Sequence, residues 1–354
     1  MSAPSKPSMR TAVTERLGIE YPLLAFSHSE HVVVAVSNAG GLGSLPCALL
    51  SPASMRDELE RITAQMKKPY NVNFFCHRKP TPNLERESAW RAAVAPYFRE
   101  LELELDATPA PAGRQPFNDE VADLLSEFKP AVVSFHFGLP APELLARVRA
   151  WGAKVLSTAT TIEEARWLEA HGADAIIAQG LEAGGHRGMF LTDDLTRQLG
   201  TMALLPQIVE AVNVPVIAAG GIVDTKTVAA ALSLGAAGVQ VGTAYLLCPE
   251  ATTSAVHRAA LKSEAARHTA LTNVFTGRPA RGIVNRVMRE LGPMSAAAPE
   301  FPLAAAAMAP LRAKAESLGL GDFSPLWAGE NISGCKETPA ADLTRELAAG
   351  FGPG

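Results

Sequence analysis

The feature that most constrains the fold of this chain is a regular alternation of short apolar runs with amphipathic helical stretches. Several of the apolar runs are almost continuously hydrophobic, as strands covered on both faces of a parallel sheet are. Eight runs predict strands: Pro22–Phe26, Gly43–Pro46, Tyr70–Phe75, Ala131–His136, Lys154–Thr158, Ala175–Gln179, Val214–Ala219 and Gly238–Gly242. Strands that alternate with helices favour an α/β fold with a parallel sheet.

The segments between the runs carry the signals of helix starts. Ser51–Met66 and Thr161–His171 each begin at a residue that can cap a helix, and Thr225–Leu234 follows the capping residue Asp224. Eight strands with intervening helices predict a closed (β/α)8 barrel, the TIM barrel. An open, doubly wound sheet is the alternative fold.

The chain has 354 residues, which exceeds a minimal barrel and leaves room for additions. We expect the barrel to span residues 12–253. Within it, Arg78–Gln115 is a long insertion that contains a predicted helix, Leu84–Leu103. Residues 254–323 predict a small helical accessory subdomain over the barrel mouth, and residues 324–354 predict a return to the barrel.

Composition excludes several functional classes. The net charge is −4, without the basic stripe of a nucleic-acid-binding protein or the cationic amphipathic helix of a membrane-bound one. No apolar run is long enough to span a bilayer, and the first residues are too polar for a signal peptide. The four cysteines form no CxxC pair, so we expect reduced thiols and a cytoplasmic protein. Separately, we expect a monomer or a homodimer.

Function in such a barrel collects in the loops that follow the carboxyl ends of the strands. Glycine and short polar residues concentrate at these ends: Asn73, His136, the run 179–188, the run 218–224 and the run 240–246. Gly220 and Gly221 follow the seventh strand, and Gly242 and Thr243 follow the eighth. Loops at these two positions form the usual phosphate pocket of TIM barrels. The alternative is that the glycines only make tight turns.

The sharpest local pattern is GGHRG, residues 184–188, after the sixth strand. Glycines around one histidine predict backbone packed against a flat ligand, with the imidazole of His186 directed at it. A neutral imidazole is a natural general base for a proton next to an electron-withdrawing group. The alternative is a solvated histidine in a turn. No carboxylate pairing or HxH spacing accompanies the histidines, so no metal site is expected.

These motifs together resemble the nitronate monooxygenase family, formerly called 2-nitropropane dioxygenases. The matching pieces are AVSNAGGLGSL (35–45), YNVNFF, VVSFHFGLP, ADAIIAQGLEAGGHRG, VPVIAAGGI and GVQVGTAYL. They occur in the family's order and spacing from Tyr21 to Leu247. A weaker continuation runs through TNVFTGRPARGIVN and SPLWAG.

The resemblance implies an FMN enzyme. In the family, this enzyme oxidises alkyl nitronates with O2 to carbonyl compounds and nitrite, and nitroalkanes are a second substrate class. His186 would be the catalytic base, needed to take the α-proton of a neutral nitroalkane. FMN would be held by Asn73, Gln179, Gly184, Gly221, Gln240, Val241, Gly242 and Thr243.

The first loop departs from the family pattern. Many relatives have a QAPM-like stretch there, whereas this chain reads LAFSHSEH, residues 24–31. We expect Ser27 and His28, with His136, to line the substrate pocket. Three alternatives remain at this point. They are an FMN-dependent NAD(P)H reductase of quinones or enoyl thioesters, a non-catalytic flavin- or phosphate-binding module, and a barrel whose glycine loops are purely structural.

Overall fold

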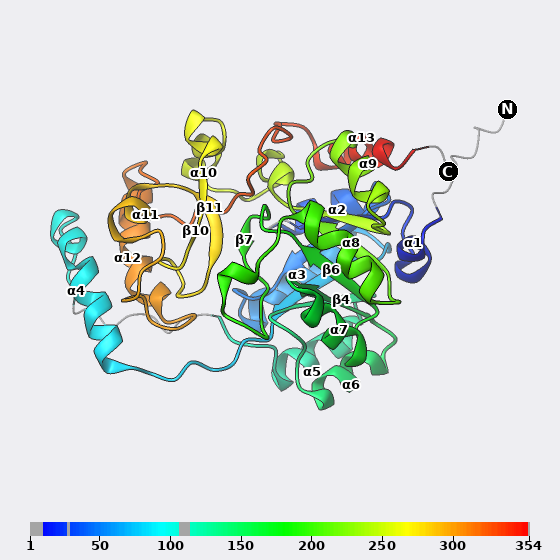
Figure 1. Ribbon diagram of the computed structural model, residues 1–354, viewed down its shortest axis with the longest axis horizontal. Coiled ribbons are helices and arrows are strands. Elements are labelled where there is room, and N and C mark those ends of the chain that lie inside the picture. The colour runs from blue at the N-terminus through cyan, green and yellow to red at the C-terminus, as the bar shows by residue number, and fades with distance from the viewer. Residues whose placement is uncertain (1–9, 27–28, 106–113, 353–354) are drawn as a thin grey trace.

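The computed structural model describes residues 10–26, 29–105 and 114–352, and it shows a closed barrel of parallel strands surrounded by helices (Figure 1). In order around the barrel the strands are β1 (Leu23–Phe26), β2 (Leu42–Pro46), β3 (Asn71–Phe75), β4 (Val132–His136), β5 (Lys154–Ala159), β6 (Ala175–Gln179), β8 (Val216–Ala219) and β9 (Gly238–Val241). The ring closes where β9 pairs with β1, with Gln240 opposite Leu24. The predicted (β/α)8 barrel is confirmed, and every predicted strand boundary lies within two residues of the observed one.

Helices cover the outside of the strands and begin at capping residues. The helices around the barrel are α1 (Ala12–Leu17), α2 (Glu30–Asn38), α3 (Pro52–Gln65), α5 (Asp119–Phe128), α6 (Pro142–Ala150), α7 (Ile162–Ala170), α8 (Thr201–Ala211), α9 (Thr225–Ser233) and α13 (Ala340–Ala348). The side chains of Ser51, Thr161 and Asp224 each accept a backbone N–H from the first turn of the following helix. The three predicted caps are therefore present.

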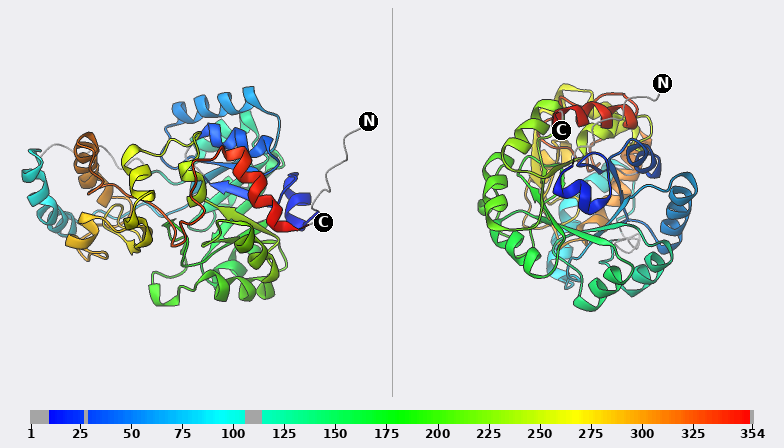
Figure 2. Two further views of the ribbon diagram at one scale, coloured as in Figure 1. Left: turned by 90° about the horizontal axis from the view of Figure 1, so that it is seen from above. Right: turned by 90° about the vertical axis from the view of Figure 1, so that its right-hand side faces the viewer.

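Helix α1 closes one end of the barrel. Val13 and Leu17 pack with Leu24, Leu42 and Ile177 from the strands inside the barrel. In the right-hand view of Figure 2, α1 lies at the centre of the ring of helices. Because this is the amino-terminal end of the strands, the opposite end remains for a binding site.

The additions to the barrel gather beyond the carboxyl ends of its strands, on the left of Figure 1. The accessory segment, residues 254–323, contains α10 (Ala255–Leu261), η3 (Glu264–Arg267), β10 (Thr269–Thr272), β11 (Ala280–Ile283), α11 (Arg286–Leu291) and α12 (Ala304–Ser317). Helix α4 (Leu84–Glu100), from the insertion, packs against it. Trp90 and Phe98 of α4 share a buried apolar cluster with Met308 and Leu311 of α12. Two segments far apart in the sequence thus build one body.

A second, three-stranded sheet joins this body to the barrel. Its order is β10, β11 and β7 (Gly185–His186). The accessory segment, expected to be helical, therefore also contains a β-hairpin. Its strands are short and are completed by pairing with β7, about 95 residues earlier, so local periodicity does not reveal them. The remaining short helices are η1 (Leu195–Arg197), η2 (Thr243–Leu247) and η4 (Ala349–Phe351). No helix in the described ranges is long and apolar enough to cross a membrane.

Candidate active site

The loops after β8 and β9 form a rim of hydrogen-bond donors at the open end of the barrel. Gly221 has a φ of +73°, a conformation that glycine adopts without strain. Within the described residues, no hydrogen bond is formed by the backbone N–H of Gly221 or of Gly242. A Cβ added to Gly242 would meet only the carbonyl oxygen of Phe26, at 3.7 Å. A ligand can therefore approach this backbone closely and accept its hydrogen bonds.

The carboxyl-terminal segment packs against the same rim. The Gly329 N–H donates to Thr243 Oγ1 at 3.0 Å, and Asn331 Nδ2 donates to the Gly221 carbonyl at 3.1 Å. Thr243 Oγ1 accepts in its contact with Gly329, so its own hydrogen is left to donate. Gln240 is half-buried and Val241 is buried at the end of β9. The rim thus combines free N–H and O–H donors, the chemistry that binds phosphate.

Gln179, the last residue of β6, holds the loop that carries His186. Its Nε2 donates to the His186 carbonyl at 2.9 Å, and its Oε1 accepts the Gly188 N–H at 2.8 Å. Both ends of the amide are engaged, so these contacts fix its orientation. The structure therefore gives Gln179 a positioning contact within the protein.

Gly184 lies where two backbone segments meet. A Cβ at this position would come within 2.6 Å of the Ala328 carbonyl carbon and the Gly329 nitrogen. Gly188 is similarly enclosed, since its Cβ would lie 2.6 Å from Thr158 Cγ2. Tight packing alone thus accounts for glycine at both positions of the GGHRG pattern.

His186 lies on β7, between the barrel and the accessory segment. It pairs with Ala280 of β11, Gly185 pairs with Arg281, and the Arg187 N–H donates to the Pro279 carbonyl at 2.9 Å. The imidazole therefore extends from a short strand held on both sides, not from a free loop. It comes from the same end of the barrel as the glycine rim.

The imidazole of His186 is enclosed by aromatic rings and one hydroxyl group. Only 9% of the residue is exposed, and its ring centroid lies 5.3 Å from Phe301, 5.5 Å from Trp327 and 5.8 Å from Phe75. Its Nε2 is 2.9 Å from Thr276 Oγ1. The same hydroxyl is 3.5 Å from the Arg278 carbonyl oxygen, which can only accept.

Both contacts of Thr276 are satisfied when its hydroxyl donates to the Arg278 carbonyl and His186 Nε2–H donates to the hydroxyl. In this arrangement Nδ1 of His186 carries the lone pair. Burial lowers the pKa of His186 well below 6.5, and the positive charges of Arg114 and Arg278 lower it further. At neutral pH the imidazole is therefore uncharged and able to accept a proton.

His136, at the end of β4, supports His186 through the backbone. Its Nε2 lies 3.0 Å from the His186 carbonyl oxygen, and its Nδ1 lies 3.1 Å from Thr158 Oγ1. Since a carbonyl only accepts, His136 carries its proton on Nε2. Burial lowers its pKa to about 3. His136 is thus a neutral donor that helps to fix β7.

A buried polar network that the sequence did not indicate continues behind this strand. Arg187 is fully buried and donates to the carbonyls of Gly180 and Gln179 and to Gln198 Oε1, at 2.7 to 3.0 Å. Gln198 Nε2 donates in turn to Thr160 Oγ1.

The network ends at a buried carboxylate. Thr160 donates from its N–H and hydroxyl to Glu164, which also accepts the N–H groups of Phe190 and Leu191. From sequence, Glu164 is only an acidic residue in the first turn of a helix. A charged side chain at a fully buried position marks it, but burial emerges only from the fold.

Asn73 lies in the middle of β3 and is buried. Its Nδ2 donates to the Ser134 carbonyl at 3.3 Å and to Ser134 Oγ at 2.9 Å. The carbonyl contact fixes which end of the amide is the donor. The Oδ1 atom has no partner among the described residues, and this leaves an acceptor available to a ligand.

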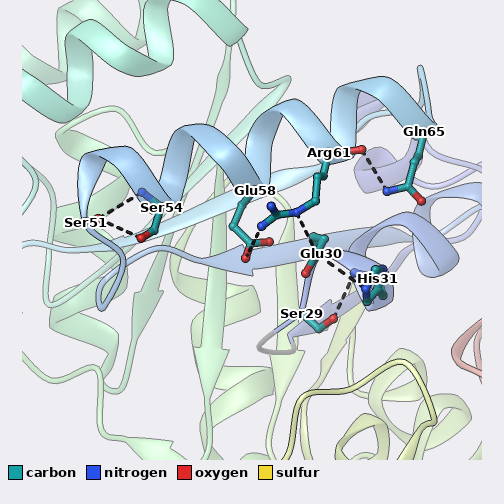
Figure 3. Close-up of polar contacts among 8 residues, drawn as sticks. All are labelled: Ser29, Glu30, His31, Ser51, Ser54, Glu58, Arg61 and Gln65. Carbon is teal, nitrogen blue, oxygen red and sulfur yellow. Dashed lines mark hydrogen bonds and ion pairs between the residues drawn. The ribbon is translucent and has the colours of Figure 1, made fainter.

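The residues Ser27 and His28, predicted to line the substrate pocket, lie outside the described residues. The residues that follow them are held on the barrel wall (Figure 3). Ser29 Oγ accepts the His31 N–H, and Glu30 and Glu58 both contact Arg61, at 3.1 Å each. Burial and the hydrogen bond to Glu30 raise the pKa of Glu58. This cluster anchors the start of α2, where the first loop returns to regular structure.

The described part of the chain contains no group of three His, Cys, Asp or Glu side chains placed to hold a metal ion. The site presents a rim of N–H and O–H donors and a neutral imidazole.

Comparison with known proteins shows the family to which the chain belongs. The profile of the nitronate monooxygenase family matches residues 10–350. The nitronate monooxygenase of Pseudomonas aeruginosa is 39% identical over 96% of this chain and 98% of its own length. The nitroalkane oxidase of Streptomyces ansochromogenes superposes with a TM-score of 0.87 at 37% identity, covering 96% of this chain and 98% of that one. FabK from Thermotoga maritima is more distant, with a TM-score of 0.72 at 26% identity over 97% and 96% of the two chains. The chain therefore belongs to the nitronate monooxygenase family and is an oxidoreductase.

Proposed function

We propose that this protein oxidises alkyl nitronates with O2 to carbonyl compounds and nitrite, with FMN as its cofactor. One observation carries the proposal: a neutral, buried imidazole, His186, is fixed at the same end of the barrel as a rim of unpaired donors. Family membership and the resemblance to a nitroalkane oxidase support the same chemistry.

The cofactor fits the donors and acceptors that the site leaves free. The unpaired N–H groups of Gly221 and Gly242 and the hydroxyl of Thr243 suit the phosphate. Gln240 and Val241, at the end of β9, lead into that rim, and the free Oδ1 of Asn73 suits an N–H of the flavin ring system. FMN, when bound, supplies the electron acceptor. Gln179 and Gly184, whose contacts within the protein are already satisfied, would act by shaping the loop.

His186 has a distinct role for each substrate class. A neutral nitroalkane must lose its α-proton before it can be oxidised, and the lone pair on the imidazole can accept that proton. A nitronate has already lost it. His186 is therefore required for nitroalkanes and dispensable for nitronates.

The proposal is tested with the purified protein. We expect bound FMN in the visible spectrum, rapid O2 consumption with propionate 3-nitronate, and no bleaching of the flavin by NADH or NADPH without oxygen. Fast bleaching by either nucleotide, together with no nitronate turnover, would instead establish the alternative NAD(P)H reductase. A colourless protein that FMN cannot reconstitute would favour the barrel with structural loops.

A further inference from the structure

Two arginine side chains next to His186, Arg278 and Arg114, form no ion pair with a carboxylate in the described part of the chain. Arg278 lies with Cζ 4.1 Å above the ring of Phe137, and it donates from Nη2 to the Met189 carbonyl. Its Nε is buried without a hydrogen-bond partner. In the described ranges, no carboxylate forms an ion pair with this guanidinium. Its direct contacts are therefore an aromatic face and one carbonyl, while Asp193, Glu164 and Glu300 act on its charge without forming an ion pair.

Arg114 lies against the same group of aromatic rings. Its Cζ lies 5.9 Å from the ring of Phe301, whose centroid is 5.3 Å from that of His186. Among the residues that the structure describes, the Arg114 guanidinium forms no hydrogen bond or ion pair, whereas the Arg114 backbone hydrogen-bonds with His77. Burial lowers the pKa of Arg114 to about 10, and the charge of Arg312 acts in the same direction.

A third polar side chain, His77, faces these rings and has one unpaired nitrogen among the described residues. His77 is 5% exposed, and its Nδ1 is buried with no hydrogen bond. Its ring centroid lies 4.8 Å from that of Phe301 and 6.4 Å from that of Phe137. Burial lowers the pKa of His77 to about 4. Two buried atoms without a partner, Arg278 Nε and His77 Nδ1, thus lie with the Arg114 guanidinium around one aromatic cluster next to His186.

Other buried arginines of the same protein are satisfied. Arg187 donates to three acceptor groups, and Arg281 pairs with Glu330 at 2.9 Å. Burying a charge without a partner costs several kcal/mol, so proteins pair such charges or use them to bind ligands. The contrast with Arg187 and Arg281 indicates that the missing partner of Arg114 and Arg278 is a ligand.

We propose that Arg114 and Arg278, with His77 beside them, form a binding site for a planar oxyanion with two oxygens, the charge that a nitronate or a carboxylate presents. A guanidinium fork matches such a group with two parallel hydrogen bonds. The assignment of this oxyanion to the substrate rests on the proposed function. In this site the charged oxygens of the substrate lie next to His186, and the imidazole of His186 faces the substrate carbon.

The arrangement also has a consequence for proton removal. When His186 takes the α-proton of a nitroalkane, the C–H electron pair forms a C=N bond and the two nitro oxygens gain the negative charge. Arginines placed at those oxygens stabilise the charge as it develops. A bound anion in turn offsets the two positive charges that depress the pKa of His186, so that pKa rises on binding.

A phosphate could satisfy the same arginines, so the test separates cofactor from substrate. Acetate, which has the size and shape of the nitronate of nitromethane, serves as the probe. Its affinity is measured by calorimetry for the wild type, R114Q, R278Q and R278K, and FMN affinity is measured for each. R166Q is the matched control, because Arg166 is exposed on the outer helix α7.

We expect acetate affinity to fall at least tenfold in R114Q and R278Q and less in R278K, which keeps the charge but not the fork. R166Q should equal the wild type, and FMN affinity should change little in any variant. Unchanged acetate affinity in R114Q and R278Q would overturn the proposal, as would wild-type protein that does not bind acetate. Loss of FMN affinity with acetate binding retained would also overturn it, since the arginines would then serve the cofactor.

Turnover separates this inference from the proposed function. If the wild type fails to oxidise nitronates but acetate binding still depends on both arginines, the function is wrong and the anion site stands. If the wild type oxidises nitronates and R114Q and R278Q keep its KM, the function stands and the anion site is wrong.

Discussion

The two sides of the barrel mouth are built in different ways. The glycine rim comes from two successive strand–loop units, with Gly221 and Gly242 only 21 positions apart along the chain. The His186 side combines residues from the whole chain: Phe75 of β3, Thr276 of the accessory segment and Phe301 near α12. The comparison shows that a rim of free backbone donors can arise from two local motifs. The surroundings of a proton acceptor such as His186 require residues that only the folded chain brings together.

The largest effect that separates the two sides is expected from His186→Asn. General acid–base catalysis contributes about 10²- to 10⁴-fold in rate, so we expect kcat/KM for nitroethane to fall at least 100-fold. Turnover of the corresponding nitronate should change little, and FMN content should not change, because the rim is untouched. Oxygen consumption with each substrate measures both rates. An equal loss for nitroethane and its nitronate would contradict the base role.

Gly184→Ala tests the packing that joins the two sides. The added Cβ would come within 2.6 Å of the backbone of Ala328 and Gly329, and overpacking of this kind costs about 1–3 kcal/mol. We expect the free energy of unfolding in urea to fall towards the upper end of that range. Gly185→Ala is the control. Its Cβ would meet nothing within 4 Å, and only its φ of +74° opposes the change, at a cost of about 1–2 kcal/mol. Equal losses would show that backbone contact at Gly184 is unimportant.

The histidines on the His186 side of the mouth predict that the stability of the folded protein falls in acid. The glycine rim has no such group. The pKa of His136 is about 3 in the folded protein, against about 6.5 when unfolded. Between these values the unfolded chain binds more protons, so this contribution to stability is complete above pH 6.5 and is lost as the pH falls towards 3. At pH 5 the loss is about 2 kcal/mol.

His136→Gln removes this titration while keeping an amide N–H for the His186 carbonyl. Urea unfolding at pH 7.5 and pH 5.0 measures the pH dependence. We expect a smaller difference between the two pH values in the variant, with the remainder due to His77 and His186, whose pKa values are also lowered. An identical difference in the wild type and the variant would show that His136 titrates normally in the folded protein.

The difference between local motifs and long-range contacts also explains which features the sequence could predict. The strands, the caps at Ser51, Thr161 and Asp224, and the positions of the glycine loops follow from local periodicity and turn chemistry. The sequence did not predict that Glu164 would be a buried acceptor or that β11 would pair with His186. Both depend on contacts between residues 26 to about 95 positions apart, and local pattern does not contain that information. The motif TNVFTGRPARGIVN contains Thr276. Its contact with the His186 imidazole depends on the fold and cannot be inferred from the motif alone.

Thr276 allows the His186 side of the mouth to be tested alone, because its hydroxyl contacts His186 and not the glycine rim. Val in its place keeps the shape but removes the acceptor for His186 Nε2–H, so the proton is free to move to Nδ1 and the lone pair then faces the wrong way. We expect kcat/KM for nitroethane to fall about tenfold, roughly 1.4 kcal/mol.

A merely structural role for Thr276 would lower both activities together, so nitronate turnover is the control and should be retained in Thr276→Val. Thr276→Ser restores the hydroxyl and should recover most of the nitroethane rate. The ¹⁵N shifts of the His186 ring distinguish the two neutral tautomers directly, and Thr276→Val should shift them towards the Nδ1-protonated form. If the variant keeps the wild-type tautomer and the wild-type nitroethane rate, the proton is held on Nε2 by some other contact. The second side of the mouth would then depend less on the accessory segment than its geometry indicates.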